Sequence, residues 1–334
     1  MGYRELTEKV MSGEYLDKSE IIEIVSLIKN SSLSDLEFVA ILTAMQTRDQ
    51  LKGISVEEYK NFVEAFRTNE CPDIDNALCN SGTGGDKFET INISTIASII
   101  IASGGINVLK NGSKGTRGGR GSKEAFEALG INTLEDIDQV FGEARKVGIG
   151  YYDFSKIVPI KGRAGVKSPL NLLGPLCNPV HLKYKVMGCS NKDFSEKIEP
   201  ILEQVCENYM ITYNPSIDEI SLCEPTIISE RRNQVRSKYT FNPIEHGFTE
   251  VKYSEILSPK DDGENVELML SVLGGKEGPA REIVCLNAGA GLYLASKANS
   301  VREGYKLAMA LIDSRKAMRK LIEWREQQKD GATH

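Results

Sequence analysis

The sequence predicts an α/β protein that combines a small helical domain with a larger α/β domain around a mostly parallel central sheet. Two observations lead to this fold class. The first 68 residues carry only helical patterns, and from Asn76 onward short apolar strands alternate with helices and glycine-rich turns. Such repetition of strand, helix and strand is typical of a parallel sheet that helices cover on both faces. The length of 334 residues suits one large domain or two smaller ones.

The N-terminal segment contains two helix starts of the capping-box kind, at Ser32 with Asp35 and at Ser55 with Glu58. Behind them, apolar side chains recur at the spacing of a helix face: Phe38, Ile41, Leu42, Met45, Tyr59, Phe62, Val63 and Phe66. This spacing predicts amphipathic helices that bury one face against each other. A membrane or a partner protein on the same face is the alternative.

The remaining elements follow in order along the chain. Strands are predicted at 77–80, 106–109, 148–152, 185–188 and 210–213, with helices between them at 93–102, 123–129, 137–146 and 194–209. A hairpin around Asn233 is predicted for 227–241, and helices follow at 266–273, 288–298 and 301–324, the last opened by Ser300 with Glu303. We expect the polar stretch 258–265 to form a mobile surface loop.

Composition narrows the classes of function. The 41 basic and 47 acidic residues give a net charge of −6, which disfavours a broad nucleic-acid-binding surface. No apolar run approaches the roughly 18 residues that a membrane span needs, and the first six residues lack the apolar region of a signal peptide. The prediction is a cytoplasmic protein without a membrane partner.

Cysteine and histidine are arranged unfavourably for metal or triad chemistry. The seven cysteines include no C-x-x-C pair, which argues against a disulfide framework and against a zinc cluster. The three histidines, at 181, 246 and 334, include no pair at the spacing of metal ligands. Most cysteines are therefore expected in the core.

Two glycine-rich segments indicate an anion site. Residues 80–86, Asn-Ser-Gly-Thr-Gly-Gly-Asp, follow a predicted strand, and Asn-Ile-Ser-Thr at 92–95 begins a predicted helix. Backbone amides at glycines and at a helix N-terminus bind phosphate, although a tight structural turn also favours glycine. The segment 110–123 places five cationic side chains among five glycines, a composition that an anion would order. Two such loops predict a ligand with more than one phosphate group, and neither matches a nucleotide fingerprint.

The adjacent carboxylates Asp218 and Glu219 follow the last predicted strand of the parallel set. A pair of this kind is usually surface charge. Beside a polyphosphate it offers the oxygen ligands that Mg²⁺ prefers.

Together these motifs resemble the anthranilate phosphoribosyltransferase family, which is related to pyrimidine nucleoside phosphorylases. The resemblance rests on residues 82–86 and 92–95, on Asn-Leu-Leu-Gly-Pro-Leu-Cys-Asn-Pro at 171–179, on Asp-Glu-Ile-Ser at 218–221 and on Asn-Ala-Gly-Ala at 287–290. It implies a homodimer with a helical domain of residues 1–68, completed by about 165–182. It also implies an α/β domain of residues 76–164 and 183–330 that binds phosphoribosyl pyrophosphate.

The family roles transfer to positions in this chain. The resemblance implies that the donor phosphoribosyl pyrophosphate is bound by Gly82, Gly85, Asp86, Thr90, Asn92, Ser94, Thr95, Lys110, Gly112, Lys114, Gly118 and Ser122. Lys110 would also be the catalytic cation, and Ser94, Asp218 and Glu219 would bind Mg²⁺. Positions that face the acceptor would be Asn111, Ser113, Lys161 and Arg163.

These acceptor positions depart from the family pattern. The family sequence Lys-His-Gly-Asn-Arg is replaced by Lys-Asn-Gly-Ser-Lys at 110–114, and the stretches Phe-Ala-Pro and His-Pro-Ala-Met are missing. Lys161, or less favourably Arg163, stands where the family has an arginine that contacts the anthranilate carboxylate. Arg117 and Arg120 replace small residues of the family and would meet an extra negative charge on a substrate or form weak surface ion pairs.

The predicted function is Mg²⁺-dependent transfer of the phosphoribosyl group to a small aromatic or heterocyclic acceptor, which need not be anthranilate, with release of pyrophosphate. One alternative is a nucleoside phosphorylase. The other, from a different class, is a non-catalytic relative that binds nucleic acid through the basic loop. The acidic composition and the Asp218–Glu219 pair weigh against the second alternative.

Overall fold

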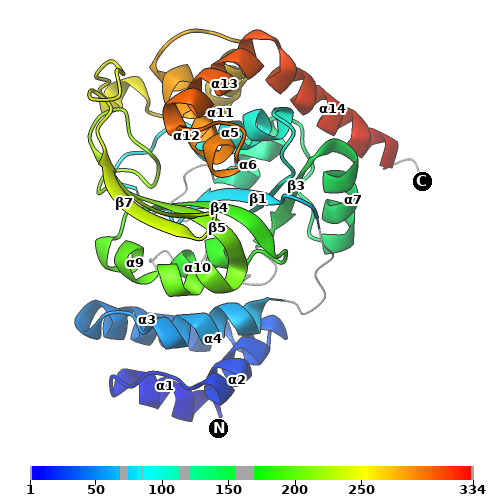
Figure 1. Ribbon diagram of the computed structural model, residues 1–334. Helices are drawn as coiled ribbons and strands as arrows, with labels where there is room; N and C mark the ends of the chain where they lie inside the picture. Colours follow the sequence, from blue (N-terminus) through cyan, green and yellow to red (C-terminus); the bar gives the residue numbers. More distant parts are fainter. Residues whose placement is uncertain (1, 68–73, 85, 113–120, 155–168, 332–334) are drawn as a thin grey trace.

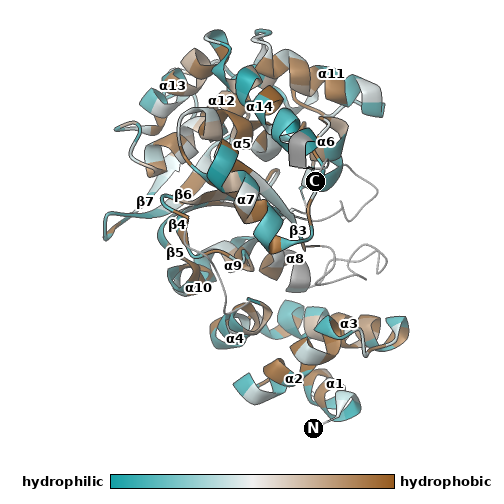
Figure 2. Cartoon of the chain, turned by 90° about the vertical axis from the view of Figure 1, so that its right-hand side faces the viewer, coloured by the Kyte–Doolittle hydropathy of each residue, from teal (hydrophilic) through white to brown (hydrophobic). Residues whose placement is uncertain are grey.

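The chain folds into three layers in the computed structural model, with the N-terminal helices lying below an α/β body (Figures 1 and 2). The structure describes residues 2–67, 74–84, 86–112, 121–154 and 169–331. The predicted fold class, a helical domain followed by an α/β domain with a mostly parallel sheet, is confirmed. No helix in these described ranges is long and apolar enough to cross a membrane.

The helical part consists of α1 (Tyr3–Met11), α2 (Lys18–Lys29), α3 (Asp35–Lys52) and α4 (Val56–Phe66). The predicted apolar stripes of α3 and α4 are buried, which confirms the helix-on-helix interpretation. Ser55 caps α4 as predicted. The box of α3 is made by Ser34 with Glu37 and not by Ser32 with Asp35, because the helix begins at Asp35 and the cap must precede its first residue.

The central sheet has seven strands in the order β3-β2-β1-β4-β5-β6-β7. The parallel strands are β1 (Leu78–Gly82), β2 (Val108–Gly112), β3 (Ile149–Asp153), β4 (Leu182–Cys189) and β5 (Cys206–Tyr213). The antiparallel hairpin of β6 (Thr226–Arg232) and β7 (Val235–Phe241) completes one edge, with Asn233 in its turn as predicted. The helix α5, between β1 and β2, packs on one face of the sheet. The helices α9 and α10, between β4 and β5, pack on the opposite face.

Helices cover both faces of the sheet (Figure 1). Those described after β1 are α5 (Ile93–Ser103), α6 (Ser122–Ala128), α7 (Ile137–Val147), α8 (Pro169–Leu173), the 3-10 helix η2 (Gly174–Leu176), α9 (Lys192–Lys197) and α10 (Glu199–Val205). After the hairpin come the 3-10 helix η3 (Tyr253–Glu255), α11 (Asp262–Leu273), α12 (Pro279–Leu294), α13 (Val301–Asp313) and α14 (Lys316–Gly331). The α8 helix contacts α3 and α4, so this part of the chain lies against the N-terminal helices.

Two hydrophobic cores lie on opposite faces of the sheet, because successive residues of a strand point to opposite sides. Leu78 and Val108 join the core under α5, α12 and α14. Their neighbours Cys79 and Leu109 join the core that α10 shares with the N-terminal helices. Each of these strands therefore has one face toward each core.

Four predicted elements were wrong in detail. The helix predicted at 288–298 is α12, which begins at Pro279 and ends at Leu294. The predicted helix 194–209 is divided into α9 and α10, because Pro200 lies in the first turn of a new helix, and the strand β5 already begins at Cys206. The predicted helix 301–324 breaks after Asp313, where Arg315 adopts a left-handed backbone with φ 63°. The predicted surface loop 258–265 is exposed at 260–264, but its second half is helical, since α11 begins at Asp262 and Asn265 is buried.

Candidate active site

The described members of the predicted phosphate-binding set lie at or near the carboxyl edge of the sheet. The first glycine-rich loop follows β1, the second follows β2, and the Asp218–Glu219 pair follows β5. These strands are parallel, so their carboxyl ends share one edge. The crossovers leave β1 and β4 in opposite directions, and ligands of open α/β sheets bind in the crevice that such a switch point creates.

The first glycine-rich loop is anchored to the neighbouring strands and to Asp218. The Thr83 amide donates to the Gly188 carbonyl oxygen at 2.9 Å, and the Gly84 amide donates to Asp218 Oδ2 at 2.6 Å. Gly84 has a φ of +68°, in the left-handed region that favours glycine. One amide of the loop, that of Gly84, thus faces a carboxylate, and that of Thr83 holds the loop to β4.

Asp218 packs directly over two glycines. A Cβ atom on Gly82 would stand 1.8 Å from Asp218 Oδ2, and one on Gly188 would stand 1.4 Å from the Asp218 carbonyl oxygen. The Asp218 amide donates in turn to Asp86 Oδ1 at 2.8 Å. The glycines are therefore required so that the segment after β5 can approach β1 and β4.

Three carboxylates crowd together at this place. Burial raises the pKa of Glu219, and the neighbouring Asp218 raises it further, whereas Ser94 lowers it through hydrogen bonds from its amide and its side chain. Burial and Asp218 likewise raise the pKa of Asp86. The cluster favours a proton or a cation. Within the described part of the chain, no three acidic, cysteine or histidine side chains converge closely enough to hold a metal by themselves.

Lys110 belongs to β2, and its side chain reaches Ser94 at the start of α5. It is 2% exposed, and its Nζ donates to the Asn80 carbonyl oxygen at 2.5 Å and to Ser94 Oγ at 3.1 Å. Burial lowers the pKa of Lys110, while Glu219 raises it. Asn80 Nδ2 donates to the Ser94 carbonyl oxygen at 2.8 Å, but its buried Oδ1 has no hydrogen-bond partner. A cation, a hydroxyl and an unused acceptor thus meet beside the carboxylates.

Gly112, the last residue of β2, lies next to Ser122. Ser122 begins α6, and its Oγ is 3.3 Å from the Tyr151 hydroxyl. A Cβ atom on Gly112 would stand 2.3 Å from Ser122 Oγ. The two ends of the second glycine-rich loop are therefore adjacent, and they lie next to the strand that carries Lys110.

Asn111 points to the opposite face of the sheet from Lys110. Its Nδ2 donates to the Gly174 carbonyl oxygen at 2.8 Å, and its Oδ1 accepts from Asn178 Nδ2 at 3.3 Å. The side chain is 2% exposed. Asn111, which was predicted to face the acceptor substrate, thus holds β2 to the segment around Gly174.

The other predicted residues divide into two groups. Thr90 and Asn92 lie in the segment between β1 and α5 that pairs with residues 256–258, and Thr95 lies in the first turn of α5. Six predicted residues lie outside the described ranges: Gly85, Ser113, Lys114, Gly118, Lys161 and Arg163, and so does Arg117. Arg120 also lies outside them.

Sequence reasoning missed Lys185 beneath the site. This fully buried lysine of β4 donates from Nζ to Ser81 Oγ at 2.6 Å and to Cys79 Sγ at 3.2 Å. Burial raises the pKa of Cys79, but Lys185 and Lys110 bring it below its usual value. The available signal was a lysine at the start of the predicted strand 185–188, where no other residue is polar.

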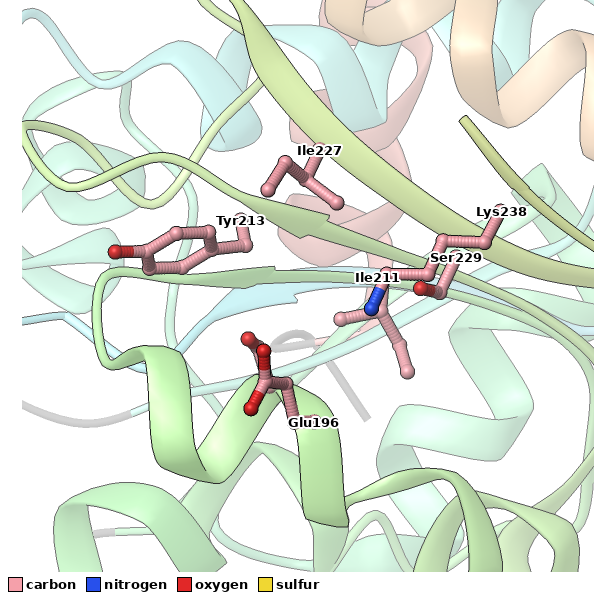
Figure 3. A pocket seen from close by; sticks show the side chains of 7 residues that line it. Glu196, Ile211, Tyr213, Ile227, Ser229 and Lys238 are labelled. Carbon is pink, nitrogen blue, oxygen red and sulfur yellow. The ribbon is translucent and has the colours of Figure 1, made fainter. Parts of the chain in front are cut away.

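Figure 3 shows a small pocket that is lined by other residues than those of this site. It lies between α9 and the strands β5, β6 and β7 and is lined by Ser195, Glu196, Ile211, Tyr213, Ile227, Ser229 and Lys238. None of these seven residues was predicted as a site residue. We assign the candidate site to the carboxyl edge at β1 and not to this pocket.

The chain matches known protein families along most of its length. Residues 75–318 match a glycosyl transferase family model described as an a/b domain, and residues 4–69 match the helical bundle domain of the same family. Anthranilate phosphoribosyltransferase of Acetivibrio thermocellus is 32% identical over 330 residues, which cover 95% of this chain and 94% of the relative. The Clostridium kluyveri protein of the same name is 33% identical, with 96% and 97% covered.

Solved structures share the fold. Anthranilate phosphoribosyltransferase from Thermus thermophilus superposes with a TM-score of 0.84 at 26% identity, covering 96% of this chain and 98% of that one. The Saccharomyces cerevisiae enzyme in complex with PRPP and Mg has a TM-score of 0.80 at 20% identity, with 97% of each chain covered.

Proposed function

The chain belongs to the anthranilate phosphoribosyltransferase family and is a phosphoribosyltransferase, and we propose that it transfers the phosphoribosyl group of phosphoribosyl pyrophosphate to an acceptor other than anthranilate. The acceptor is a small aromatic or heterocyclic molecule, and pyrophosphate is released. The observation that carries this proposal is the meeting of the Gly84 amide, Ser94 and Lys110 with the Asp218–Glu219 pair at the switch point of the sheet.

The donor would be held along this edge by the residues that the sequence predicts. The described members are Gly82, Asp86, Thr90, Asn92, Ser94, Thr95, Lys110, Gly112 and Ser122. Their amides and hydroxyls suit phosphate oxygens, and the N-terminus of α5 adds a favourable dipole. The curated relatives that are about a third identical support this substrate class through their name.

Magnesium fits the donor set of Ser94, Asp218 and Glu219. The raised pKa of Glu219 has a neighbouring carboxylate among its causes, and a divalent cation would relieve that repulsion. Mg²⁺ commonly takes only one or two carboxylates and completes its coordination with phosphate oxygens and water. When bound, the ion would neutralise charge on the pyrophosphate. The Saccharomyces cerevisiae structure in complex with PRPP and Mg gives the same pairing of ligands in a protein of this fold.

The residues of this chain would act mainly by position and charge. The bond between the ribose C1 and the pyrophosphate oxygen breaks with its electron pair on pyrophosphate, and the acceptor forms the new bond to C1. Backbone amides of the first loop and Lys110 would stabilise the charge of the departing group. No covalent nucleophile is needed, which agrees with the burial of most described cysteines.

Anthranilate is expected to be a poor acceptor because the acceptor positions differ from the family. Asn111 and Ser113 replace a histidine and an asparagine, and Lys161 replaces an arginine. Lysine keeps the charge but loses the two-pronged fit to a carboxylate.

The function is tested by pyrophosphate release. The protein is incubated with phosphoribosyl pyrophosphate, Mg²⁺ and a panel of aromatic acids, phenols and azoles, and a parallel reaction contains a nucleoside with inorganic phosphate. We expect release of pyrophosphate with at least one member of the panel. Phosphorolysis of the nucleoside without pyrophosphate release would contradict the proposal and favour a phosphorylase.

The metal assignment is tested by Asp218→Asn with Glu219→Gln. This double variant keeps the side-chain shapes and removes both charges, so Mg²⁺-dependent binding of phosphoribosyl pyrophosphate should fall sharply in calorimetry. Glu323→Gln with Glu326→Gln, which removes two charges from α14 far along the chain from the site, is the control. Unchanged Mg²⁺-dependent binding in the first variant would show the assignment to be wrong.

We also propose a cytoplasmic homodimer. Leu36 and Leu51 of α3 are 84% and 81% exposed, which leaves large apolar side chains on the helical part for a second subunit to cover. The six described cysteines are free thiols, as is usual in a reducing compartment. Light scattering coupled to gel filtration would measure the mass, and a monomer at micromolar concentration would contradict the dimer.

A further inference from the structure

Asn92 precedes α5 but does not cap it. Asparagine at this position normally accepts a hydrogen bond on its side-chain oxygen from the second or third amide of the helix. Asn191 does so at α9, where Oδ1 accepts from the Phe194 amide at 2.9 Å. Asn92 makes no such bond, and its backbone, with φ −71° and ψ 66°, lies outside the extended region that Asn191 adopts.

Because Asn92 does not cap α5, its side chain accepts from none of the amides in the first turn of that helix. The Ile93 amide donates to the Ile91 carbonyl oxygen, and the Ile96 amide donates to the Asn92 carbonyl oxygen. The Ser94 amide lowers the pKa of Glu219. Within the described part of the chain, the Thr95 amide has no hydrogen-bond acceptor. This is the third amide of the helix, which an asparagine cap usually takes.

Asn265 of α11 explains the orientation of Asn92. Its side chain is 1% exposed, and its Nδ2 donates to Asn92 Oδ1 at 3.1 Å. Its own Oδ1 accepts from Ser258 Oγ at 3.1 Å, so both ends of the amide group are used. The side-chain oxygen of Asn92 is thereby drawn toward α11 and away from the helix it precedes.

The backbone on both sides reinforces this contact. The Ile91 amide donates to the Ile256 carbonyl oxygen at 3.0 Å, and the Ser258 amide donates to the Glu89 carbonyl oxygen at 2.9 Å. The stacked rings of Phe88 and Tyr253, with centroids 4.2 Å apart, join the same two segments. Residues 253–265 thus hold the stretch that leads from the first glycine-rich loop into α5.

We propose that Asn265 is a positioning residue, which holds Asn92 away from the N-terminus of α5 and so keeps the Thr95 amide open to a phosphate group of the donor. The inference rests on the proposed function, because it concerns the same site. A helix N-terminus favours negative charge, and an amide already taken by a cap has to exchange that partner before it can bind phosphate. Asn265 removes this competition without touching the donor.

The first test replaces Asn265 by leucine, which has a similar size and makes no hydrogen bonds. We expect the KM for phosphoribosyl pyrophosphate to rise by about tenfold or more, with kcat changed by less than about twofold. Calorimetric titration of the variant with phosphoribosyl pyrophosphate and Mg²⁺ should show the same loss of affinity. Ser271→Ala on the same helix, where Ser271 Oγ donates within α11 to the Leu268 carbonyl oxygen, should leave KM unchanged.

A double-mutant cycle separates positioning from a general structural effect. If Asn265 acts through Asn92, Asn265→Leu should have no further effect on donor affinity in an Asn92→Ala background. Additive losses, or an equal fall of kcat and donor affinity, would overturn the inference. Asn265→Ala removes both side-chain hydrogen bonds without adding volume or charge, so it should raise KM as well, even if the leucine variant does not fold.

The outcomes also distinguish the inference from the proposed function. If the unaltered protein binds phosphoribosyl pyrophosphate and the Asn265 variants bind it equally well, the positioning role is wrong and the function stands. If the unaltered protein does not bind this donor, both fail.

Discussion

Asp218 reaches the first glycine-rich loop only because two other residues lack a side chain. Gly82 ends β1 and Gly188 lies in β4, and the carboxylate and the main chain of Asp218 occupy the space that their Cβ atoms would fill. Sequence reasoning identified Asp218 from its acidic neighbour and Gly82 from the loop. It did not connect the two, because a contact across 134 positions, such as that between Gly84 and Asp218, leaves no local pattern.

Gly82→Ala should therefore damage the site without removing a polar group. The added methyl group would displace Asp218, and a displacement of about 1 Å can lower activity by roughly 10²-fold. We expect kcat/KM to fall by that order. Gly142→Ala in α7 is the matched control, since its Cβ would meet no atom within 4 Å and alanine is favoured over glycine in a helix by about 1 kcal/mol. Equal activity of both variants would contradict this account of Asp218.

The acceptor residues allow a second prediction at this scale. Anthranilate turnover should be below the ordinary enzyme range of roughly 10⁴ M⁻¹s⁻¹, and the triple variant Asn111→His, Ser113→Asn, Lys161→Arg should raise it. Steady-state formation of phosphoribosyl anthranilate measures both. The melting temperature is recorded in parallel, since Asn111 also holds the Gly174 carbonyl oxygen. Efficient use of anthranilate by the unaltered protein would refute the prediction.

Among the elements, those with a strong local signal could be predicted from the sequence. The α5 helix and the β6–β7 hairpin were predicted within a residue or so, from an apolar run ending at glycine and from a turn at Asn233. The division of 194–209 could not be placed, because pairing of β5 with β4 overrides helical periodicity from Cys206 onward. The ordering of 258–265 likewise depends on Asn92, which lies 173 positions away from Asn265.

The helices α3 and α4 are joined by a buried ion pair that predicts a large effect on stability. Arg48 and Glu58 have side chains that are each 1% exposed, and Arg48 Nη1 donates to Glu58 Oε1 at 2.9 Å. Burial raises the pKa of Glu58, although Arg48 lowers it. Removal of one partner leaves the other charge buried and unpaired.

Arg48→Met should lower the free energy of unfolding by about 3–5 kcal/mol, measured by chemical denaturation. The exposed pair of Lys18 and Glu64, 57% exposed on each side, provides the comparison. Lys18→Ala should change the free energy by less than about 1 kcal/mol. Similar losses for both variants would mean that the burial of the Arg48 pair is not what determines its contribution.

At the scale of the whole molecule, the N-terminal helices and the sheet share one core. Tyr59 of α4 lies 6.0 Å from Phe194 of α9 between ring centroids, and both belong to the core on the lower face of the sheet. The sequence predicted the helices and the sheet separately. It could not predict that they share a core, because each apolar stripe is equally compatible with several partners.

The shared core predicts cooperative unfolding. The chain has one tryptophan, Trp324, which is fully buried in α14 and donates to Glu143 at 3.0 Å. Its fluorescence reports on the α/β part, whereas circular dichroism reports on all helices. We expect the two transitions to coincide in a denaturant titration. Loss of helical signal at a lower denaturant concentration, with unchanged fluorescence, would show that α1–α4 unfold independently.

The packing of α4 against α10 also has a consequence during synthesis on the ribosome. The apolar face of α4 is complete at Phe66, but part of the core that covers it comes from Ile201 and Leu202 of α10. More than a hundred residues must be added before this cover exists, which takes on the order of ten seconds at ordinary elongation rates. The nascent chain therefore exposes the apolar face of α4 to solvent for that time. Chaperones that recognise apolar segments should associate with it before β5 emerges.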